Sequence, residues 1–115
     1  MEQRVLVMVR ASISPEKEEA FNRWYNEDHL PKTLERVPTI LSGRRYKVMD
    51  FGGESLPGVE KYRYIAMYEF ESYEALQSFY KSDLLKPSIR EYTEAWGEGG
   101  RYHLRAIELK SLFVR

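Results

Sequence analysis

Two segments of the sequence are apolar at both odd and even positions, and this sets the strongest limit on the fold. In residues 3–11, valines alternate with other apolar side chains, and residues 61–70 carry aromatic side chains on one parity and aliphatic ones on the other. Successive side chains of a strand point to opposite faces of a sheet. A sheet built from these strands must therefore be covered on both faces. The valines and the aromatic residues would share one face of this sheet, and the opposite face would carry Leu6, Met8, Ile65 and Met67.

Helix signals separate the strand-like runs. Ser14-Pro15-Glu16 is typical of a helix start, with Ser14 as the N-cap, and predicts a helix over 15–28. Pro31 follows, and the residue before a proline avoids the helical region. Leu30, Leu34 and Val37 form a second apolar row out of phase with Phe21 and Trp24. We therefore predict a break near His29-Leu30 and a second segment over 31–37.

A second helical region is predicted from Ser72 to Trp96. Ser72 is its expected N-cap, and Asp83 and Pro87 interrupt it. Its second part has one apolar stripe at helical spacing. That stripe comprises Leu85, Ile89, Tyr92 and Trp96.

With strands expected over 3–11, 39–49, 61–70 and 101–114, the order is β-α-β-β-α-β. This order is that of an α+β, ferredoxin-like fold, with a four-stranded antiparallel sheet and helices on one face. At 115 residues the chain is expected to be one domain, 1–115, with an exposed loop over 50–60. The two helical regions cover only one face, so we predict that a second copy covers the other in a homodimer.

Composition limits the partners. Lysine plus arginine and aspartate plus glutamate both number 18, so there is no positive charge excess to attract a nucleic acid. The strand at 63–70 superficially resembles the RNA-binding strand of the RNA-recognition fold, but Tyr64 stands at its glycine position, and Ile65 and Met67 stand where bases would stack. The chain has no cysteine and no apolar run near the roughly 18 residues of a membrane span. We expect a cytoplasmic protein that binds neither nucleic acid nor membrane.

The run Phe21-Asn22-Arg23-Trp24-Tyr25-Asn26-Glu27-Asp28-His29-Leu30-Pro31 resembles the dimeric α–β barrel superfamily, and most of all its EthD-like branch. Members of that branch often have an aromatic-rich first helix that ends in a His-x-Pro element. Gly43-Arg44-Arg45-Tyr46 and Tyr68-Glu69-Phe70-Glu71-Ser72 are similar as well. The resemblance implies a dimeric α–β barrel with a cleft between helices and sheet in each subunit. It does not fix the activity, because the superfamily includes lactone isomerases, polyketide cyclases, dehydratases, small monooxygenases and haem-degrading enzymes.

His29 is the candidate catalytic residue. Imidazole titrates near neutral pH, as a general acid–base group must. We expect the helix end and the neighbouring Glu27 and Asp28 to favour its protonated form. The alternative is a structural role, in which His29 caps the helix or bonds to Asp28.

Candidate substrate-binding residues are mainly aromatic. Tyr64 and Tyr68 share a strand parity and could wall a pocket whose hydroxyls orient a carbonyl or phenol. Arg44 or Arg45 could neutralise an oxyanion. The alternative is that both side chains are simply solvated at the protein surface. Plain packing is the alternative for each aromatic residue. The expected binding set is Tyr46, Tyr64, Tyr68, Trp96, Trp24 and Arg44.

Metal and cofactor sites are not predicted. His29 and His103 lack ligand spacing, and the role of His103 stays open. The haem-degrading relatives use a histidine on the second helix, and residues 72–96 contain none. The leading hypothesis is a cofactor-independent lyase, isomerase, cyclase or small monooxygenase acting on a small apolar or aromatic carbonyl compound. The alternative is a non-catalytic or stress-associated homodimer that binds a small molecule.

Overall fold

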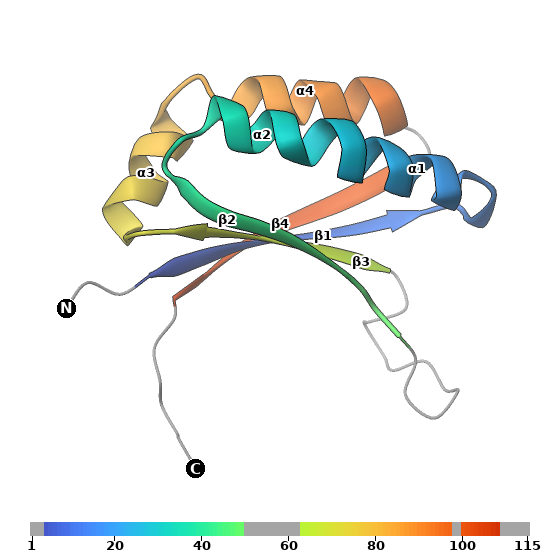
Figure 1. Cartoon of the computed structure of the whole chain (residues 1–115), viewed down its shortest axis with the longest axis horizontal. Helices are drawn as coiled ribbons and strands as arrows, with labels where there is room; N and C mark the ends of the chain where they lie inside the picture. Colours follow the sequence, from blue (N-terminus) through green and yellow to red (C-terminus); the bar gives the residue numbers. More distant parts are fainter. Residues whose placement is uncertain (1–3, 50–62, 98–99, 109–115) are drawn as a thin grey trace, which may run out of the picture.

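The chain forms one antiparallel sheet with helices on a single face (Figure 1). The computed structural model describes residues 4–49, 63–97 and, for the backbone, 100–108. The strands are β1 (Val5–Ile13), β2 (Ile40–Lys47), β3 (Tyr64–Phe70) and β4 (Gly100–Glu108), in the spatial order β2-β3-β1-β4. The predicted α+β, ferredoxin-like order is confirmed. The predicted loop at 50–60 and the strand ends at 61–62 and 109–114 lie outside the described residues.

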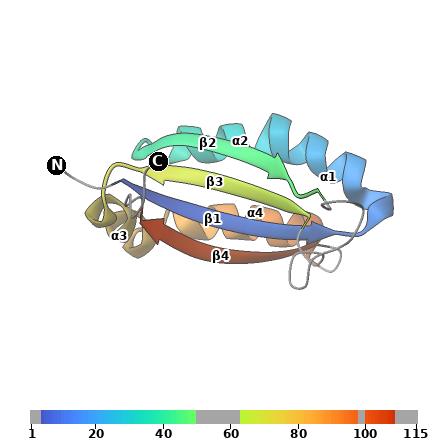
Figure 2. The same ribbon diagram turned by 90° about the horizontal axis from the view of Figure 1, so that it is seen from below.

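Two helical segments form one layer on a single face of the sheet (Figures 1 and 2). The first runs from a 3-10 turn, η1 (Pro15–Lys17), through α1 (Glu18–Trp24) and a π-helical turn, η2 (Tyr25–His29), to α2 (Leu30–Arg36). The second comprises α3 (Tyr73–Lys81) and α4 (Leu85–Trp96). Ser72 caps α3, since its Oγ accepts a hydrogen bond from the N–H of Ala75 at 3.1 Å. Ser14 holds the N-cap position of η1 but makes no side-chain cap bond.

The predicted break near His29-Leu30 is wrong, because the helix continues through it as a π turn. Leu30 keeps helical angles (φ −64°, ψ −50°), and its N–H donates to the carbonyl of Tyr25, five residues back. In a regular α-helix the ring of Pro31 would collide with the carbonyl of Glu27, and Pro31 has no N–H to donate. The wider π turn accommodates both defects without ending the helix.

The π turn also keeps the buried stripe aimed at the sheet. Every fourth residue of this run is buried, in the order Phe21, Tyr25, His29, Thr33 and Val37. Four residues of α-helix advance by about 400°, so such a stripe would drift by about 40° at each step. The extra residue in the π turn offsets most of this drift. The second apolar row, Leu30, Leu34 and Val37, is therefore out of phase with the first because the π turn changes the number of residues per helical turn at this point.

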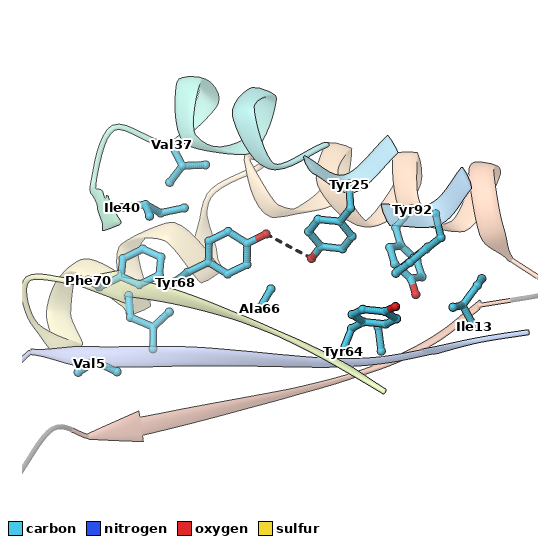
Figure 3. Packing of buried hydrophobic residues seen from close by; sticks show 13 residues of the cluster. Val5, Ile13, Tyr25, Val37, Ile40, Tyr64, Ala66, Tyr68, Phe70 and Tyr92 are labelled. Atoms are coloured by element: carbon cyan, nitrogen blue, oxygen red, sulfur yellow. Dashed lines mark hydrogen bonds between the residues drawn. The ribbon is translucent and has the colours of Figure 1, made fainter. Parts of the chain in front are cut away.

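The core lies between the helices and one sheet face (Figure 3). Phe21, Val37 and Phe70 are its largest fully buried side chains. On β3 the members that face the helices are Tyr64, Ala66, Tyr68 and Phe70, and all four are buried. The predicted shared face of Tyr64 and Tyr68 is thus confirmed.

The other sheet face carries no helix (Figure 2). Its central side chains are half-buried and come from the opposite parity of β1 and β3, where Met8 lies directly across from Met67. We call this the open sheet face. Its described apolar members are Leu6, Met8, Ile65 and Met67.

Candidate functional site

A small cavity lies between the helices and the sheet. It holds about 80 Å³ of free space. Its apolar walls are Val7, Val9, Ile40, Phe70, Phe79, Leu85 and Ile89. Its polar members are Tyr25, His29, Thr33, Ser88, Tyr68 and Tyr92. The cavity therefore joins β1, β2 and β3 to the π turn, α2, α3 and α4.

The π turn places His29 in this cavity. The side chain is buried, with 5 % of the residue exposed. The imidazole stacks on the ring of Trp24, with centroids 4.6 Å apart and planes 13° apart. The ring of Tyr25 meets it edge-on at 4.9 Å. Aromatic contacts on the face and on the edge fix the orientation of the imidazole.

A carboxylate lies beside one nitrogen of that ring. Nδ1 of His29 lies 3.4 Å from Oε2 of Glu91, an ion-pair distance that is longer than a well-formed hydrogen bond. Glu91 also forms an ion pair and hydrogen bond with Arg36. This bond to Arg36 keeps the pKa of Glu91 below its ordinary value. Glu91 is therefore ionised at neutral pH.

His29 is nevertheless neutral at rest. Burial lowers its pKa below the ordinary value of 6.5, and this outweighs the opposing effect of Glu91. The expected net result, a protonated His29, is wrong: Asp28 does raise the pKa of His29, but burial outweighs it. The helix does not end at His29, and Asp28 is engaged by Lys32 at 2.9 Å.

Two tyrosine hydroxyls form a polar pair in the cavity lining. The hydroxyls of Tyr25 and Tyr68 lie 3.3 Å apart, as the dashed line in Figure 3 shows. Burial raises the pKa of Tyr25 and raises that of Tyr68 well above its ordinary value. Both hydroxyls therefore stay protonated at neutral pH. Because one donates to the other, the accepting hydroxyl keeps its own hydrogen for another partner.

Arg45 lies outside the cavity, on the far side of Tyr25. Its guanidinium carbon is 4.2 Å from the centroid of the Tyr25 ring, and it donates to the side-chain oxygens of Asn22 and Asn26 at 3.0 and 2.8 Å. The cation is thus held by an aromatic face and two amides. It braces the tyrosine pair from outside.

The predicted site residues fall into separate groups. His29 and Tyr68 line the cavity. Trp24 covers one face of His29, and Trp96 lies behind it, packed on Phe21 and Trp24 at 5.4 and 5.8 Å.

The other predicted residues lie elsewhere. Tyr46 and Tyr64 line a second, open and polar groove beside α1, together with Arg45 and Lys47. Arg44 is exposed and lies on the parity of β2 opposite to Arg45. For His103 only the backbone is described, paired with Arg10 across β1 and β4.

Six polar cavity or support residues were not predicted from the sequence: Tyr25, Thr33, Arg36, Ser88, Glu91 and Tyr92. A signal existed for Ser88, because it lies on the same face of α4 as Leu85 and Tyr92. Nothing in the sequence pairs Glu91 with Arg36, 55 residues away. Within the described ranges no three acidic, histidine or cysteine side chains are grouped to hold a metal ion. No helix in the described part of the chain has the length and apolar character to cross a membrane.

The sequence matches the family described as "Domain of unknown function (DUF4286)" over residues 4–98. The chain belongs to the DUF4286 family. No curated protein matches this DUF4286 domain.

Solved structures share the fold of this DUF4286 domain. An EthD family protein from Bacillus halodurans is 19% identical, with a TM-score of 0.63 over 90% of this chain and 96% of its own. A hydroxynitrile lyase from Passiflora edulis is 10% identical, with a TM-score of 0.74 over 99% and 100%. A dimeric ferredoxin-like protein of unknown function from Jannaschia sp. is 16% identical, with a TM-score of 0.59 over 94% and 99%. The EthD-like resemblance is thereby confirmed at the level of fold.

Proposed function

We propose that this DUF4286 domain is a cofactor-independent, lyase- or isomerase-type enzyme. It acts on a small apolar or aromatic carbonyl compound by proton transfer at His29. One observation carries the proposal: a buried, neutral imidazole lines an apolar cavity with an ionised carboxylate beside its Nδ1. The hydroxynitrile lyase from Passiflora edulis has the same fold, which is compatible with such chemistry without establishing it.

His29 acts as the general base. With its pKa lowered by burial, the imidazole is free to accept a proton at neutral pH. Nδ1 faces Glu91, so Nε2 on the opposite edge of the ring takes the proton from the carbon next to the carbonyl. The imidazolium that forms is then stabilised by the Glu91 carboxylate. Return of the proton to another carbon isomerises the substrate. In an elimination the leaving group departs from the neighbouring carbon and takes the proton from the imidazolium, which restores the neutral base.

The tyrosine pair stabilises the negative charge. Removal of the proton moves charge onto the carbonyl oxygen, where a fixed hydrogen-bond donor lowers the barrier. The hydroxyl of the Tyr25–Tyr68 pair that accepts from its neighbour has a hydrogen left for this oxygen. Its raised pKa keeps that hydrogen in place.

We also propose that the domain is a homodimer, formed through the open sheet face. A contiguous apolar sheet face is more than a soluble monomer ordinarily exposes. Leu6, Met8, Ile65 and Met67 form such a face here, and the ferredoxin-like protein from Jannaschia sp. is itself described as dimeric. Twofold pairing would cover both open faces at once.

The proposal is tested by solvent exchange. 2-Butanone, cyclohexanone and phenylacetaldehyde are incubated with the protein in D2O, and deuterium at the carbon next to the carbonyl is followed by NMR. At least one compound should exchange faster than in buffer. His29→Gln, which keeps the volume of the side chain, and His29→Ala should each lower that rate by roughly 10²–10⁴-fold.

Arg23→Ala, at an exposed position of α1, is the matched control and should keep the wild-type rate. Equal exchange in the His29 variants would rule out its role as the base. Saturable binding of a compound that never exchanges would point instead to a non-catalytic receptor.

A further inference from the structure

Ser88 carries a buried hydroxyl that no described residue satisfies. It lies on α4 and lines the cavity, with 9 % of the residue exposed. Its Oγ has no hydrogen-bond partner among the described residues. Buried polar atoms are paired in the large majority of cases, so an unpaired one needs an explanation.

The ordinary explanations for a serine within a helix fail here. Such a serine either points to solvent or donates back to a carbonyl one turn earlier. Ser88 is buried, and no back-bond is formed. Alanine would suit the helix better at this position. The hydroxyl therefore has no structural use among the described residues.

Its place in α4 puts Ser88 beside the catalytic group. Residues three and four apart share one face of a helix. Glu91 and Tyr92 follow Ser88 at these spacings, and Glu91 contacts His29 while Tyr92 lines the same cavity. A ligand beside the imidazole is thus within the part of the cavity that Ser88 lines.

Charge and size restrict what this cavity takes. None of its described lining residues is lysine, arginine, aspartate or glutamate. A carboxylate or ammonium group would be desolvated there without a counter-charge. The free space of about 80 Å³ is roughly half of the 150 Å³ of an engineered cavity that holds benzene. An aliphatic compound of a few carbon atoms therefore fits better than an aromatic ring.

We propose that the Ser88 hydroxyl binds the oxygen of a small, uncharged, aliphatic carbonyl compound in this cavity. The inference deepens the proposed function and rests on it for the role of this compound as substrate. It narrows the substrate class from apolar or aromatic carbonyls to short aliphatic ketones and aldehydes. Ser88 approaches from α4, while the tyrosine pair approaches from the sheet and the π turn.

Three probes of similar size test this inference: 2-butanone, 2-methyl-1-butene and isobutyrate. The alkene replaces the carbonyl oxygen with a methylene group, and isobutyrate adds a negative charge. Affinities are measured by NMR titration at neutral pH. Wild type should bind the ketone more tightly than the alkene and should not bind isobutyrate. In Ser88→Ala the preference for the ketone over the alkene should fall by about 3- to 10-fold, as for one lost hydrogen bond.

Ser78→Ala, at an exposed position of α3, is the matched control and should keep the wild-type preference. An unchanged preference in Ser88→Ala, isobutyrate binding as tight as ketone binding, or no ketone binding by wild type would each overturn the inference. Ser88-dependent ketone binding without any deuterium exchange would refute the proposed function alone. Exchange that depends on His29, with ketone affinity independent of Ser88, would refute the Ser88 assignment alone.

Discussion

At the scale of single residues, His29 is subject to two opposing effects on its charge. Burial against Trp24 and Tyr25 favours the neutral ring, whereas Glu91 favours the protonated one. Burial dominates, and the positive charge of Arg36 also lowers the pKa of His29. The result is a neutral imidazole beside an ionised carboxylate, which is the state that the proposed general base needs.

This balance predicts a pH dependence of stability. Because the pKa of His29 is lower in the folded state than its ordinary 6.5, the unfolded chain binds a proton more readily below about pH 6.5. The free energy of unfolding should therefore fall as the pH drops from 7.5 to 5.5, with a slope of at most about one proton. His29→Gln should lose this slope. Urea unfolding at each pH measures it.

Glu91 and His103 do not disturb this comparison. Glu91 has a pKa below its ordinary 4.5, so its own contribution is lost only at lower pH. His103 is present in both proteins, and its contribution cancels in the comparison. Equal slopes in wild type and His29→Gln would show that burial does not lower the pKa of His29.

At the scale of elements, α2 packs unusually close to β2. A Cβ added at Gly43 would lie 2.9 Å from Cδ1 of Leu30, 3.2 Å from Cδ2 of Leu34 and 3.4 Å from Cδ1 of Tyr68. Only glycine permits this approach without movement of the leucine side chains. Because α2 follows the π turn directly, this contact also helps to hold His29 over the sheet.

Overpacking at this contact should destabilise the fold. Gly43→Val would push α2 away from β2 and should lower the free energy of unfolding by about 1–3 kcal/mol. Thr39→Val introduces the same side chain at an exposed position just before β2, and should change it by less than about 0.5 kcal/mol. Denaturant titration of both variants compares them. Equal stabilities would show that the helix adapts at no cost.

At the scale of the whole molecule, the two faces of the sheet differ in what covers them. One face forms the core and the cavity, and the other is left open by the helices (Figures 1 and 2). A strip of apolar side chains runs along its centre, with Arg10 at one end and Glu69 at the other, and Glu69 forms an ion pair with Arg4 at 3.1 Å. This arrangement of an apolar centre with a polar margin is that of an interface.

A charge on the open sheet face should separate the proposed dimer. Leu6→Glu would place a second carboxylate on this face, directly across from Glu69. Glu69 already pairs with Arg4, so burying both carboxylates in a dimer would leave one without a counter-charge, which is strongly unfavourable. Light scattering after size exclusion should give wild type at twice the chain mass of 13.7 kDa and the variant at that mass. Tyr80→Glu, at an exposed position of α3, is the matched control and should stay dimeric. A monomeric wild type at micromolar concentration would disprove the dimer.

The sequence alone determined the order of the helices and strands, and it showed that the sheet carries apolar side chains on both of its faces. Both follow from local properties: the alternation of side chains along a strand, the helix-capping Ser72, and the spacing of apolar residues in α4. Residue type also made His29 and Tyr68 candidates, because few side chains can move a proton or hold an oxyanion, and both line the cavity.

Only the tertiary structure decided how the first helix continues, which charge His29 carries, and which residues surround it. The π turn depends on whether the stripe from Phe21 to Val37 must face one sheet, and that is a property of packing. The pKa of His29 depends on burial and on Glu91, a carboxylate 62 positions further along the chain. Contacts across such separations are set by how the layers meet, so no local pattern encodes Glu91 beside His29 or an unpaired hydroxyl at Ser88.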